Sequence, residues 1–396
     1  MKRFLAALCL ISILGCSSGP KLQRFTGPWD IQGLRAVPVA TFGPVTNLAQ
    51  EVYYEGEPFQ GKPTRIFAYY ARPAAGRGPF PAMLLVHGGG GKAFREWAEH
   101  WARRGYVALA MDLAGHGPDG RLADGGPGQD DENKFRDFTE TDANQMWTYH
   151  AVAAVLRGHA LLAAQPEVDR NRIGITGISW GGYLTCIVAG IDAQLKVAVP
   201  VYGCGFLNDN SVWLERFAKM SVRQRQRWGE FFDPARYLGG VNCPILFLNG
   251  SNDFAYPLDS YQKSYQRVQG PMTLSVKIRL PHGHIWTFGE VDCFVDSVLQ
   301  GALPLPALKP MKIIDGRATT SYSAKVPVTN AELNYTSDVG EWHKRRWQTV
   351  AAEIAEGKVT ARLPLDRPLV CYLSVTDARG LMVSTPHVLL SDRTNY

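Results

Sequence analysis

From residue 64 to residue 299 the sequence alternates short, uninterrupted apolar runs with longer segments of helical character. The clearest run is Ala82–His87, which contains no polar residue before its final histidine; a helical segment, Ala93–Arg104, and a second run, Tyr106–Met111, follow it. A strand that is apolar along its whole length is buried on both faces, as in a parallel sheet covered by helices. The pattern therefore predicts an α/β fold with a mostly parallel central sheet flanked by helices.

The same alternation sets the expected limits of the domains. Further strands are predicted at Arg172–Ile178, Lys196–Tyr202, Asn242–Asn249 and Thr273–Leu280, with helices at Thr141–Ala164, Trp180–Gly190, Tyr256–Arg267 and Glu290–Leu299. Residues 203–240 interrupt the series and are expected to form an insertion over the site, within a catalytic domain of residues 64–303. Residues 17–63, rich in Pro, Gly and aromatic residues, are expected to form an N-terminal arm around that domain.

After Pro304 the character of the chain changes. Residues 308–396 hold short alternating apolar runs, such as Val359–Leu363 and Leu369–Val375, separated by turn residues. The segment Glu341–Glu353 is ambiguous between helix and strand. Several short strands at regular spacing predict a small C-terminal β-sandwich of the immunoglobulin or fibronectin-III type.

The first sixteen residues have the pattern of an export signal. Lys2 and Arg3 precede the apolar run Phe4–Leu14, which is too short to span a bilayer. The run ends at Cys16 in a segment that resembles the bacterial lipobox, so lipidation of Cys16 is expected, with plain signal cleavage as the alternative. The predicted location is the cell envelope, where a lipid-anchored bacterial lipoprotein has the membrane as a partner.

Charge and cysteine content exclude several functions. The net charge is +6, but the Lys and Arg residues are scattered and no nucleic-acid-binding motif accompanies them, so nucleic acid is not the expected substrate. Beyond Cys16 five cysteines remain, widely spaced and without a Cys-X-X-Cys pattern. Buried thiols are therefore expected rather than zinc ligands, and neither a metal nor a cofactor is predicted.

The segment Gly177–Gly182 (Gly-Ile-Ser-Trp-Gly-Gly) lies between a predicted strand and a predicted helix. A sharp strand-to-helix turn of the Gly-X-Ser-X-Gly type forces the serine into a strained backbone conformation and exposes its hydroxyl. Residues on either side must be very small, because a β-carbon there would collide with the neighbouring backbone. Ser179 is therefore the predicted nucleophile.

A serine nucleophile of this type needs an acid and a histidine, in that order along the chain. Asp253 directly follows an apolar strand and is the predicted acid, which would hold the imidazole tautomer. Two histidines, His282 and His284, end the strand that is expected at Thr273–Leu280. His284 is the preferred general base because it begins a looser loop, whereas His282 is closer to the expected strand end; mutation would separate the two.

Stabilisation of an oxyanion requires backbone N–H donors close to the serine. One is expected from Trp180, which follows the nucleophile, and another from the glycines after His87. Gly89 and Gly90 are the predicted donors in this loop, and His87 is expected to order it through a hydrogen bond. Asp112, His116, Tyr202 and Trp213 are weaker candidates for the lining of a substrate pocket.

Together these segments resemble the α/β-hydrolase superfamily over about residues 64–303. The likeness is closest to secreted bacterial acetylxylan esterases, dienelactone hydrolases and prolyl-oligopeptidase-type catalytic domains. The segments that carry it are Val86–Gly91, Gly177–Ile187, Val199–Phe206, Asn252–Tyr256 and Pro281–His284. Two departures stand out, because the chain lacks the N-terminal propeller of the oligopeptidases, and Ile285 replaces the Glu that follows the histidine in many acetylxylan deacetylases.

The resemblance implies a serine hydrolase that cleaves carboxylic esters through an acyl-enzyme, most simply a carbohydrate acetyl esterase. A small-molecule or oligosaccharide ester is the substrate that it implies. A serine peptidase of the prolyl-oligopeptidase type and a non-catalytic binding protein on a hydrolase scaffold remain the alternatives.

Overall fold

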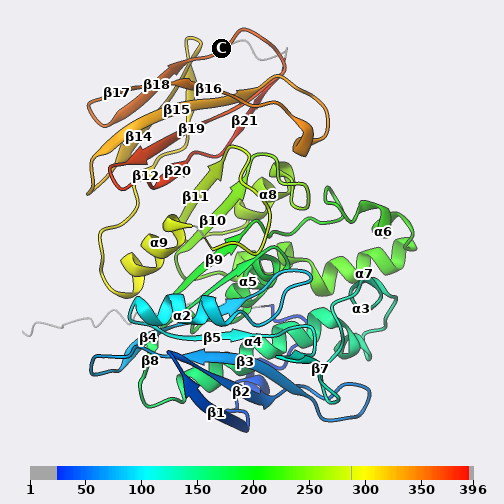
Figure 1. The fold of residues 1–396 in the computed structure, drawn as a ribbon. Coiled ribbons are helices and arrows are strands. Elements are labelled where there is room, and N and C mark those ends of the chain that lie inside the picture. The colour runs from blue at the N-terminus through cyan, green and yellow to red at the C-terminus, as the bar shows by residue number, and fades with distance from the viewer. Residues whose placement is uncertain (1–24, 287, 392–396) are drawn as a thin grey trace, which may run out of the picture.

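The computed structural model describes residues 25–286 and 288–391. The predicted signal peptide and Cys16 lie outside this part of the chain. Within it, nine strands form one large sheet, and antiparallel sheets of the C-terminal residues stack beyond one edge of it (Figure 1). The predicted α/β fold class is confirmed by this arrangement.

The large sheet is mixed at one side and parallel at the other. From edge to edge its strands are β1 (Ala40–Thr46), β2 (Ala49–Glu55), β3 (Arg65–Ala71), β5 (Val107–Met111), β4 (Phe80–Val86), β8 (Val168–Ile178), β9 (Val197–Val201), β10 (Ile245–Gly250) and β11 (Met272–Lys277). Pairing is antiparallel from β1 to β5 and parallel from β5 to β11. Parallel strands run in one direction, so the loops that follow them meet at one edge of the sheet.

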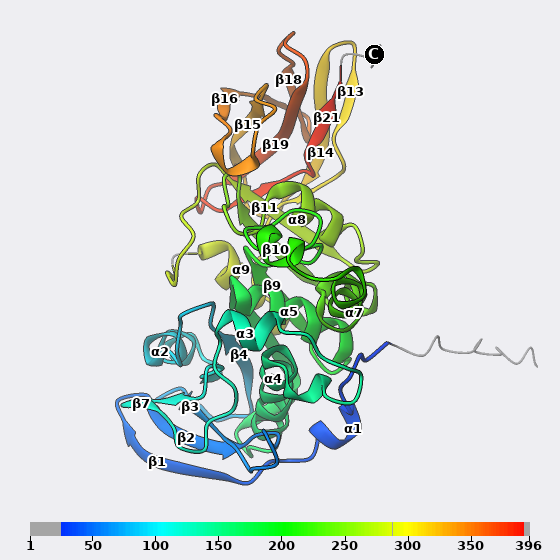
Figure 2. The ribbon, with the colours of Figure 1, turned by 90° about the vertical axis from the view of Figure 1, so that its right-hand side faces the viewer.

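Helices cover both faces of the sheet, as the fully apolar strands require. They are α1 (Ile31–Leu34), α2 (Arg95–Arg103), α3 (Asp131–Phe135), α4 (Trp147–Ala163), α5 (Trp180–Ile191), α6 (Leu214–Ala218), α7 (Val222–Phe232), α8 (Leu258–Tyr265) and α9 (Gly289–Leu299). Successive residues of β4 face opposite sides: Leu84 packs into the core under α4 and α5, and Leu85 into the core under α2 and α9. Figure 2 shows the sheet between these two layers.

The N-terminal segment differs from the predicted arm. Instead of wrapping the catalytic domain as irregular chain throughout residues 17–63, it contributes β1 and β2, which extend the large sheet by two antiparallel strands. Strand β1 is almost wholly exposed, and β2 is buried at only some positions. For this reason their sequences do not show the continuous apolar pattern of a buried strand. The domain boundary at residue 64 therefore cuts through the sheet.

Residues 203–240 form the predicted interruption. They hold α6, α7 and two short 3-10 turns, Pro234–Arg236 and Leu238–Gly240, and contribute no strand to the sheet. Trp213 from this segment packs against Trp180, with ring centroids 4.6 Å apart, so the insertion reaches the residue that follows the predicted nucleophile.

The C-terminal residues form two packed antiparallel sheets, compatible with the predicted β-sandwich. One contains β12 (Ala307–Leu308), β13 (Lys312–Ile314), β14 (Arg317–Ser323), β17 (Glu353–Ala355) and β18 (Lys358–Arg362); the other contains β15 (Val328–Thr336), β16 (Gln348–Ala351), β19 (Leu369–Asp377), β20 (Met382–Ser384) and β21 (Val388–Leu390). The ambiguous segment Glu341–Glu353 becomes a 3-10 turn, Trp342–Lys344, followed by strand β16.

The sandwich docks on the outer strand of the large sheet. The Val276 amide of β11 donates to Ser384 Oγ at 3.0 Å, and Tyr372 Oη donates to the Val276 carbonyl at 3.2 Å. Ser275 Oγ donates to the Met382 carbonyl at 2.8 Å. Side chains and backbone of the sandwich thus satisfy polar groups of β11 that would otherwise lie at an open sheet edge.

The remaining sequence expectations concern cysteines and membrane spans. The five cysteines in the described part of the chain form no disulfide there, and Cys186, Cys204, Cys243 and Cys371 are buried. No helix among the described residues is both long enough and apolar enough to cross a bilayer.

Candidate active site

The turn from β8 into α5 holds Ser179 in a strained conformation. Its φ of 59° and ψ of −119° lie outside the regions that serine ordinarily occupies, and it is the residue that immediately precedes α5. The backbone fixes this geometry from both sides, because the Ser179 amide donates to the Val201 carbonyl at 3.0 Å and its carbonyl accepts from the Tyr183 amide at 2.9 Å. The predicted nucleophile elbow is confirmed as a backbone structure.

The flanking glycines are required by close backbone approach. A β-carbon at position 181 would lie 2.0 Å from the Val86 carbonyl oxygen, and one at position 177 would lie 2.3 Å from the Gly181 oxygen. Atoms of this kind do not approach below about 3 Å without displacing the backbone. Glycine at both positions therefore lets β4, β8 and α5 converge directly behind Ser179.

His282 joins the serine hydroxyl to a buried carboxylate. Its Nε2 lies 2.8 Å from Ser179 Oγ, and its Nδ1 lies 2.7 Å from Asp253 Oδ2. Asp253 is 3% exposed, and its other oxygen accepts from the amides of Ala255 and Tyr256 at 2.9 and 2.7 Å. With the Nδ1 proton held by the carboxylate, Nε2 is left as an acceptor for the serine proton.

The preference for His284 over His282 is wrong on this geometry. His284 Nε2 lies 3.1 Å from the Gly88 amide, which donates to it, whereas the hydrogen bond to Ser179 Oγ is made by His282. The preference rested on a strand that was expected to continue to Leu280. Strand β11 ends at Lys277, so both histidines lie in one loop and closeness to the strand end does not separate them.

Aromatic side chains hold the His282 ring in place. Tyr202 lies against it with centroids 4.4 Å apart, Phe254 at 4.9 Å, and Tyr256 is parallel to it within 7° at 6.4 Å. Tyr202 also donates its hydroxyl proton to the Gly283 carbonyl of the same loop, and burial raises the pKa of that hydroxyl. Phe254 is 51% exposed, so this aromatic residue is partly open to solvent beside the imidazole.

The glycine loop after β4 forms a tight turn next to the serine. The Gly91 amide donates to the Gly88 carbonyl at 3.2 Å, and Gly90 takes a φ of 66°, which glycine adopts readily at this position of a turn. His87 orders the loop as expected, because its Nδ1 lies 2.7 Å from the Gly88 oxygen and its Nε2 accepts from the Leu113 amide at 2.8 Å. Because Nε2 accepts from a backbone amide, the His87 ring is neutral in this geometry, and burial lowers its pKa in the same direction.

Two of the residues predicted to supply oxyanion donors, Trp180 and Gly89, lie close together. Trp180 begins α5, so its amide is one of the first-turn donors that have no partner within the helix. A β-carbon at Gly89 would lie 3.0 Å from Cδ1 of the Trp180 ring, so the loop crosses directly over that residue. A β-carbon at Gly90 would meet nothing within 4 Å, so this glycine borders open space.

Trp180 belongs to an aromatic cluster that closes one side of the site. Its ring contacts Trp213, Tyr183 and Trp147 at centroid distances of 4.6, 4.8 and 5.5 Å. The Lys134 ammonium lies 4.8 Å from the Trp180 ring centroid, and burial lowers the pKa of this lysine. The sequence singled out Trp213 as a weak candidate, and the structure brings it to the site.

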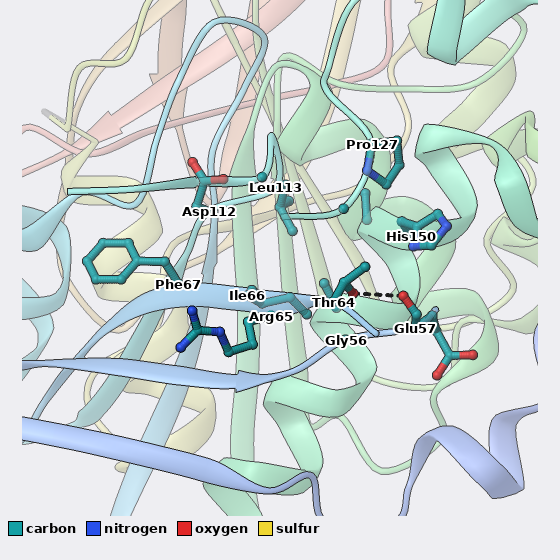
Figure 3. A pocket seen from close by; sticks show the side chains of 14 residues that line it. Gly56, Glu57, Thr64, Arg65, Ile66, Phe67, Asp112, Leu113, Pro127 and His150 are labelled. Carbon is teal, nitrogen blue, oxygen red and sulfur yellow. Dashed lines mark hydrogen bonds between the residues drawn. The ribbon is translucent and has the colours of Figure 1, made fainter. Parts of the chain in front are cut away.

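Asp112 has a structural role instead. Its Oδ1 accepts from the amides of Ala114 and His116 at 2.9 and 2.7 Å, so it orders the loop that follows β5. Figure 3 shows it at one end of a cavity of about 30 Å³, opposite His150 and Glu57, which is room for a water molecule or so. Among the described residues no three His, Cys, Asp or Glu side chains converge in the way a metal ion requires.

Two residues at the site were not predicted from the sequence, Phe254 and Asn252. Phe254 is adjacent to the predicted acid, and its place in the turn Asn252–Tyr256 could have marked it as a neighbour of the imidazole. Asn252 donates to the carbonyls of His343 and Arg345 at 3.0 and 2.7 Å, and thereby ties the acid-bearing turn to the C-terminal sandwich. No local signal announces this contact, because its partners are about ninety residues away.

Comparison with known proteins finds similar sequences and folds. Residues 44–236 match the family model described as acetyl xylan esterase (AXE1). The acetyl esterase Axe7A of Xylanibacter ruminicola is 22% identical over 240 residues, which cover 57% of this chain and 54% of that protein. A putative carboxymethylenebutenolidase of Escherichia coli K12 is 29% identical over 206 residues, which cover 51% of this chain and 65% of the relative.

A solved structure is similar over a larger part of the chain. The acetyl xylan esterase from Paenibacillus sp. R4 has a TM-score of 0.57 at 20% sequence identity, and the match covers 71% of this chain and 97% of that one. The fold of the large sheet and its helices is thus shared with that protein. The chain spans between about half and two thirds of the length of the curated relatives named above.

Proposed function

We propose that the chain is a member of the α/β-hydrolase superfamily and a serine esterase that removes acetyl groups from carbohydrates. The observation that carries the proposal is the continuous relay from Ser179 Oγ through His282 to Asp253, with contacts of 2.8 and 2.7 Å. The acetyl group and the carbohydrate come from the similarity to acetyl xylan esterases and an acetyl esterase.

The reaction follows from the protonation states of the relay. Ser179 Oγ attacks the ester carbonyl carbon while His282 Nε2 takes its proton, and Asp253 stabilises the imidazolium that forms. The tetrahedral oxyanion accepts hydrogen bonds from the amides of Trp180 and Gly89. Collapse breaks the bond to the sugar oxygen, which leaves with the proton from His282, and an acetyl-serine remains.

Water completes the cycle by the same steps in a second round. His282 removes a proton from a water molecule, the hydroxide adds to the acetyl carbon, and Ser179 recovers its proton as acetate leaves. Positioned proton transfer of this kind contributes on the order of 10²–10⁴-fold in rate. The oxyanion donors are expected to contribute a further 10²–10³-fold, roughly, each.

A fluorophosphonate probe tests whether the relay works at all. Wild-type protein should be labelled, Ser179→Ala should not, and Ser321→Ala, which removes an exposed serine of β14, should be labelled like the wild type. If labelling does not depend on Ser179, the chain would instead be a non-catalytic binding protein on a hydrolase scaffold.

A substrate panel then tests the chemistry. Acetylated xylo-oligosaccharides and p-nitrophenyl acetate should release acetate, and turnover should exceed that of feruloyl esters and of aminoacyl or peptide substrates. Faster cleavage of the peptide substrates would replace the esterase by a serine peptidase. Cleavage of feruloyl esters alone would keep the esterase and change the acyl group.

We also propose that the protein is exported and anchored to the cell envelope by lipid at Cys16. This proposal is supported by the basic residues Lys2 and Arg3, the apolar run Phe4–Leu14 and the lipobox-like end of the predicted signal peptide. Metabolic labelling with a palmitate analogue in a bacterial host should mark the wild-type chain but not Cys16→Ser. A labelled Cys16→Ser variant would place the lipid elsewhere, and an unlabelled wild type would indicate plain signal cleavage.

A further inference from the structure

His284 bridges the two loops that meet at Ser179. It lies in the segment between β11 and α9 that also carries His282, and its Nε2 accepts from the Gly88 amide at 3.1 Å. Gly88 begins the glycine turn between β4 and α2. One hydrogen bond thus joins the loop of the general base to the loop of the proposed oxyanion donor.

We propose that His284 is a positioning residue: as a neutral hydrogen-bond acceptor, it holds the glycine turn where the Gly89 amide faces the reacting carbonyl. The proposal rests on the esterase function proposed above and adds a role for the second histidine. Because the Gly88 amide is already committed to His284, it is excluded as an oxyanion donor in this arrangement. Gly89 is then the next amide along the turn.

The ring fills the space that side chains in the turn would need. A β-carbon at Gly91 would lie 2.6 Å from His284 Nε2, and one at Gly88 would lie 3.0 Å from the same atom and 2.8 Å from the Ile178 oxygen. The imidazole also packs against Phe94 and Trp97, with centroids 5.2 and 6.2 Å away. The turn and the ring are therefore complementary in shape, and neither can shift alone.

The direction of the hydrogen bond fixes the charge of His284. A backbone amide can only donate, so Nε2 must carry a lone pair and the ring proton must sit on Nδ1. Burial lowers the pKa of His284, and the nearby His282 lowers it further. The hydrogen bond donated by Gly88 also favours the neutral ring, because a protonated Nε2 has no lone pair to accept it. Of the titratable groups around the ring, His282 lies on its own loop and His87 on the glycine loop, and the residues of α2 packed on it are aromatic.

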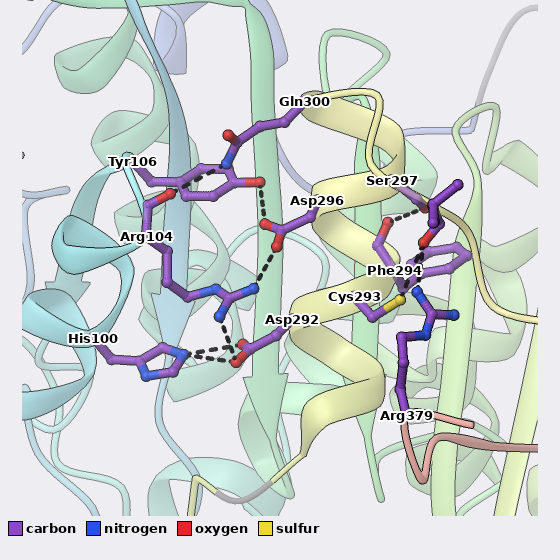
Figure 4. Close-up of polar contacts among 11 residues, drawn as sticks. His100, Arg104, Tyr106, Asp292, Cys293, Phe294, Asp296, Ser297, Gln300 and Arg379 are labelled. Atoms are coloured by element: carbon purple, nitrogen blue, oxygen red, sulfur yellow. Dashed lines mark hydrogen bonds and ion pairs between the residues drawn. The ribbon is translucent and has the colours of Figure 1, made fainter. Parts of the chain in front are cut away.

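The far ends of the two loops are fixed by a separate set of contacts. The glycine loop leads into α2 and the histidine loop into α9, and Figure 4 shows polar side chains joining these helices. His100 Nε2 lies 3.0 Å from both Asp292 oxygens, and Arg104 pairs with Asp292 at 3.4 Å and also with Asp296. With the helices clamped, the His284–Gly88 bond is a polar contact that joins the two loops next to the serine.

Protonation of His284 would place a donor against the Gly88 donor. The amide would lose its acceptor, and the turn would move away from the position that serves the oxyanion. His282 must also be neutral to accept the serine proton. Two protonations, one on each histidine, are therefore expected to inhibit at low pH.

The experiment compares wild type with His284→Ala and His284→Gln in p-nitrophenyl acetate hydrolysis. His284→Ala should lose at least about ten-fold in kcat with KM within roughly three-fold, a part of the 10²–10³-fold that a lost oxyanion donor costs. His284→Gln should recover most of the kcat, because its Oε1 can accept from Gly88. His343→Ala, on the C-terminal sandwich, is the matched histidine control.

The pH profile separates positioning from simple loss of structure. As the pH falls, log(kcat/KM) of the wild type should steepen from a slope of one to a slope of two, while His284→Gln should keep a slope of one, because glutamine does not titrate. A slope of two in His284→Gln, or an unchanged kcat in a folded His284→Ala, would overturn the proposal. If His284→Ala does not fold, the slope in His284→Gln decides alone.

Labelling by the fluorophosphonate probe distinguishes this inference from the proposed function. The probe's phosphoryl oxygen occupies the same donors as the ester oxyanion, so its labelling rate should fall in His284→Ala and recover in His284→Gln. A wild type that is not labelled contradicts the proposed function. A wild type and a His284→Ala variant that are labelled at equal rates contradict the role of His284 only.

Discussion

The nucleophile and the general base are held by two different kinds of structure. At the β8–α5 turn, Ser179 is fixed by backbone hydrogen bonds to Val201 and Tyr183. The glycines at positions 177 and 181 leave no room for a β-carbon, which would lie 2.3 and 2.0 Å from a backbone oxygen. In the loop from residue 278 to residue 288, His282 is fixed by side chains from other segments: Asp253, Tyr202 and Phe254. Backbone constraints leave a local mark in the sequence, and side-chain constraints from distant segments do not.

The largest expected effect is in a double-mutant cycle that joins the two regions. Ser179→Ala and His282→Ala should each reduce kcat by on the order of 10³-fold or more, and the double variant should lose little beyond either single one, because the two act as a unit. Initial-rate kinetics with p-nitrophenyl acetate measure all three. If the two losses multiply in the double variant, Ser179 and His282 contribute independently and do not act as a unit.

A pair of glycine substitutions compares the packing of the two regions. Gly181→Ala in the elbow should destabilise the fold by about 4 kcal/mol or more, because its β-carbon would lie 2.0 Å from the Val86 oxygen. Gly283→Ala, in the histidine loop, meets nothing within 4 Å and should change stability by less than about 0.5 kcal/mol. Chemical denaturation monitored by circular dichroism gives both values, and equal losses would remove the distinction.

The free energy of unfolding at low pH tests the C-terminal sandwich, which contacts the turn that carries Asp253. Burial lowers the pKa of His387 to about 4; Arg345 lowers it too, and Asp259 acts in the opposite direction. The unfolded chain then binds a proton that the folded one does not, so stability is full above about pH 6.5 and falls as the pH drops toward 4. The expected loss from this residue is about 3 kcal/mol.

Removal of the His387 imidazole checks the sign of that effect. His387→Gln should flatten the dependence of the unfolding free energy on pH between about 6.5 and 4, compared with wild type. His343→Gln is a suitable control, since its side chain is 37% exposed and pairs with Glu341 at the surface. A steeper loss in His387→Gln would show that the histidine is charged when folded.

The smallest expected effect concerns the link between Asn252 and the sandwich. Asn252→Ala removes the donors to the carbonyls of His343 and Arg345 and should cost about 1–3 kcal/mol of stability, with a loss of only a few-fold in kcat. Thermal unfolding and steady-state kinetics on the same preparation give both values. If kcat falls as far as in His282→Ala, the turn that carries Asp253 depends on the sandwich much more than these two bonds imply.

The sequence predicted the parts of the fold whose cause is local. The fully apolar run Ala82–His87 corresponds to β4, and Gly177, Ser179 and Gly181 define a turn that requires those residue types. It did not predict β1 and β2, because the exposed β1 carries no buried-strand pattern. The choice between His282 and His284 could not be made from the sequence either, because it depends on Asp253 and Gly88, which lie in the loops after β10 and β4.

The docking of the sandwich on β11 has a consequence for how the protein can be dissected. The Ser384, Tyr372 and Met382 contacts occupy polar groups of an outer strand whose central residues are buried. A version shortened at residue 303 would present that strand uncovered, and such a strand recruits further copies of itself into insoluble aggregates. Expression of the large sheet alone is therefore expected to yield inclusion bodies, so that an inactive truncated product would say nothing about the chemistry of its serine.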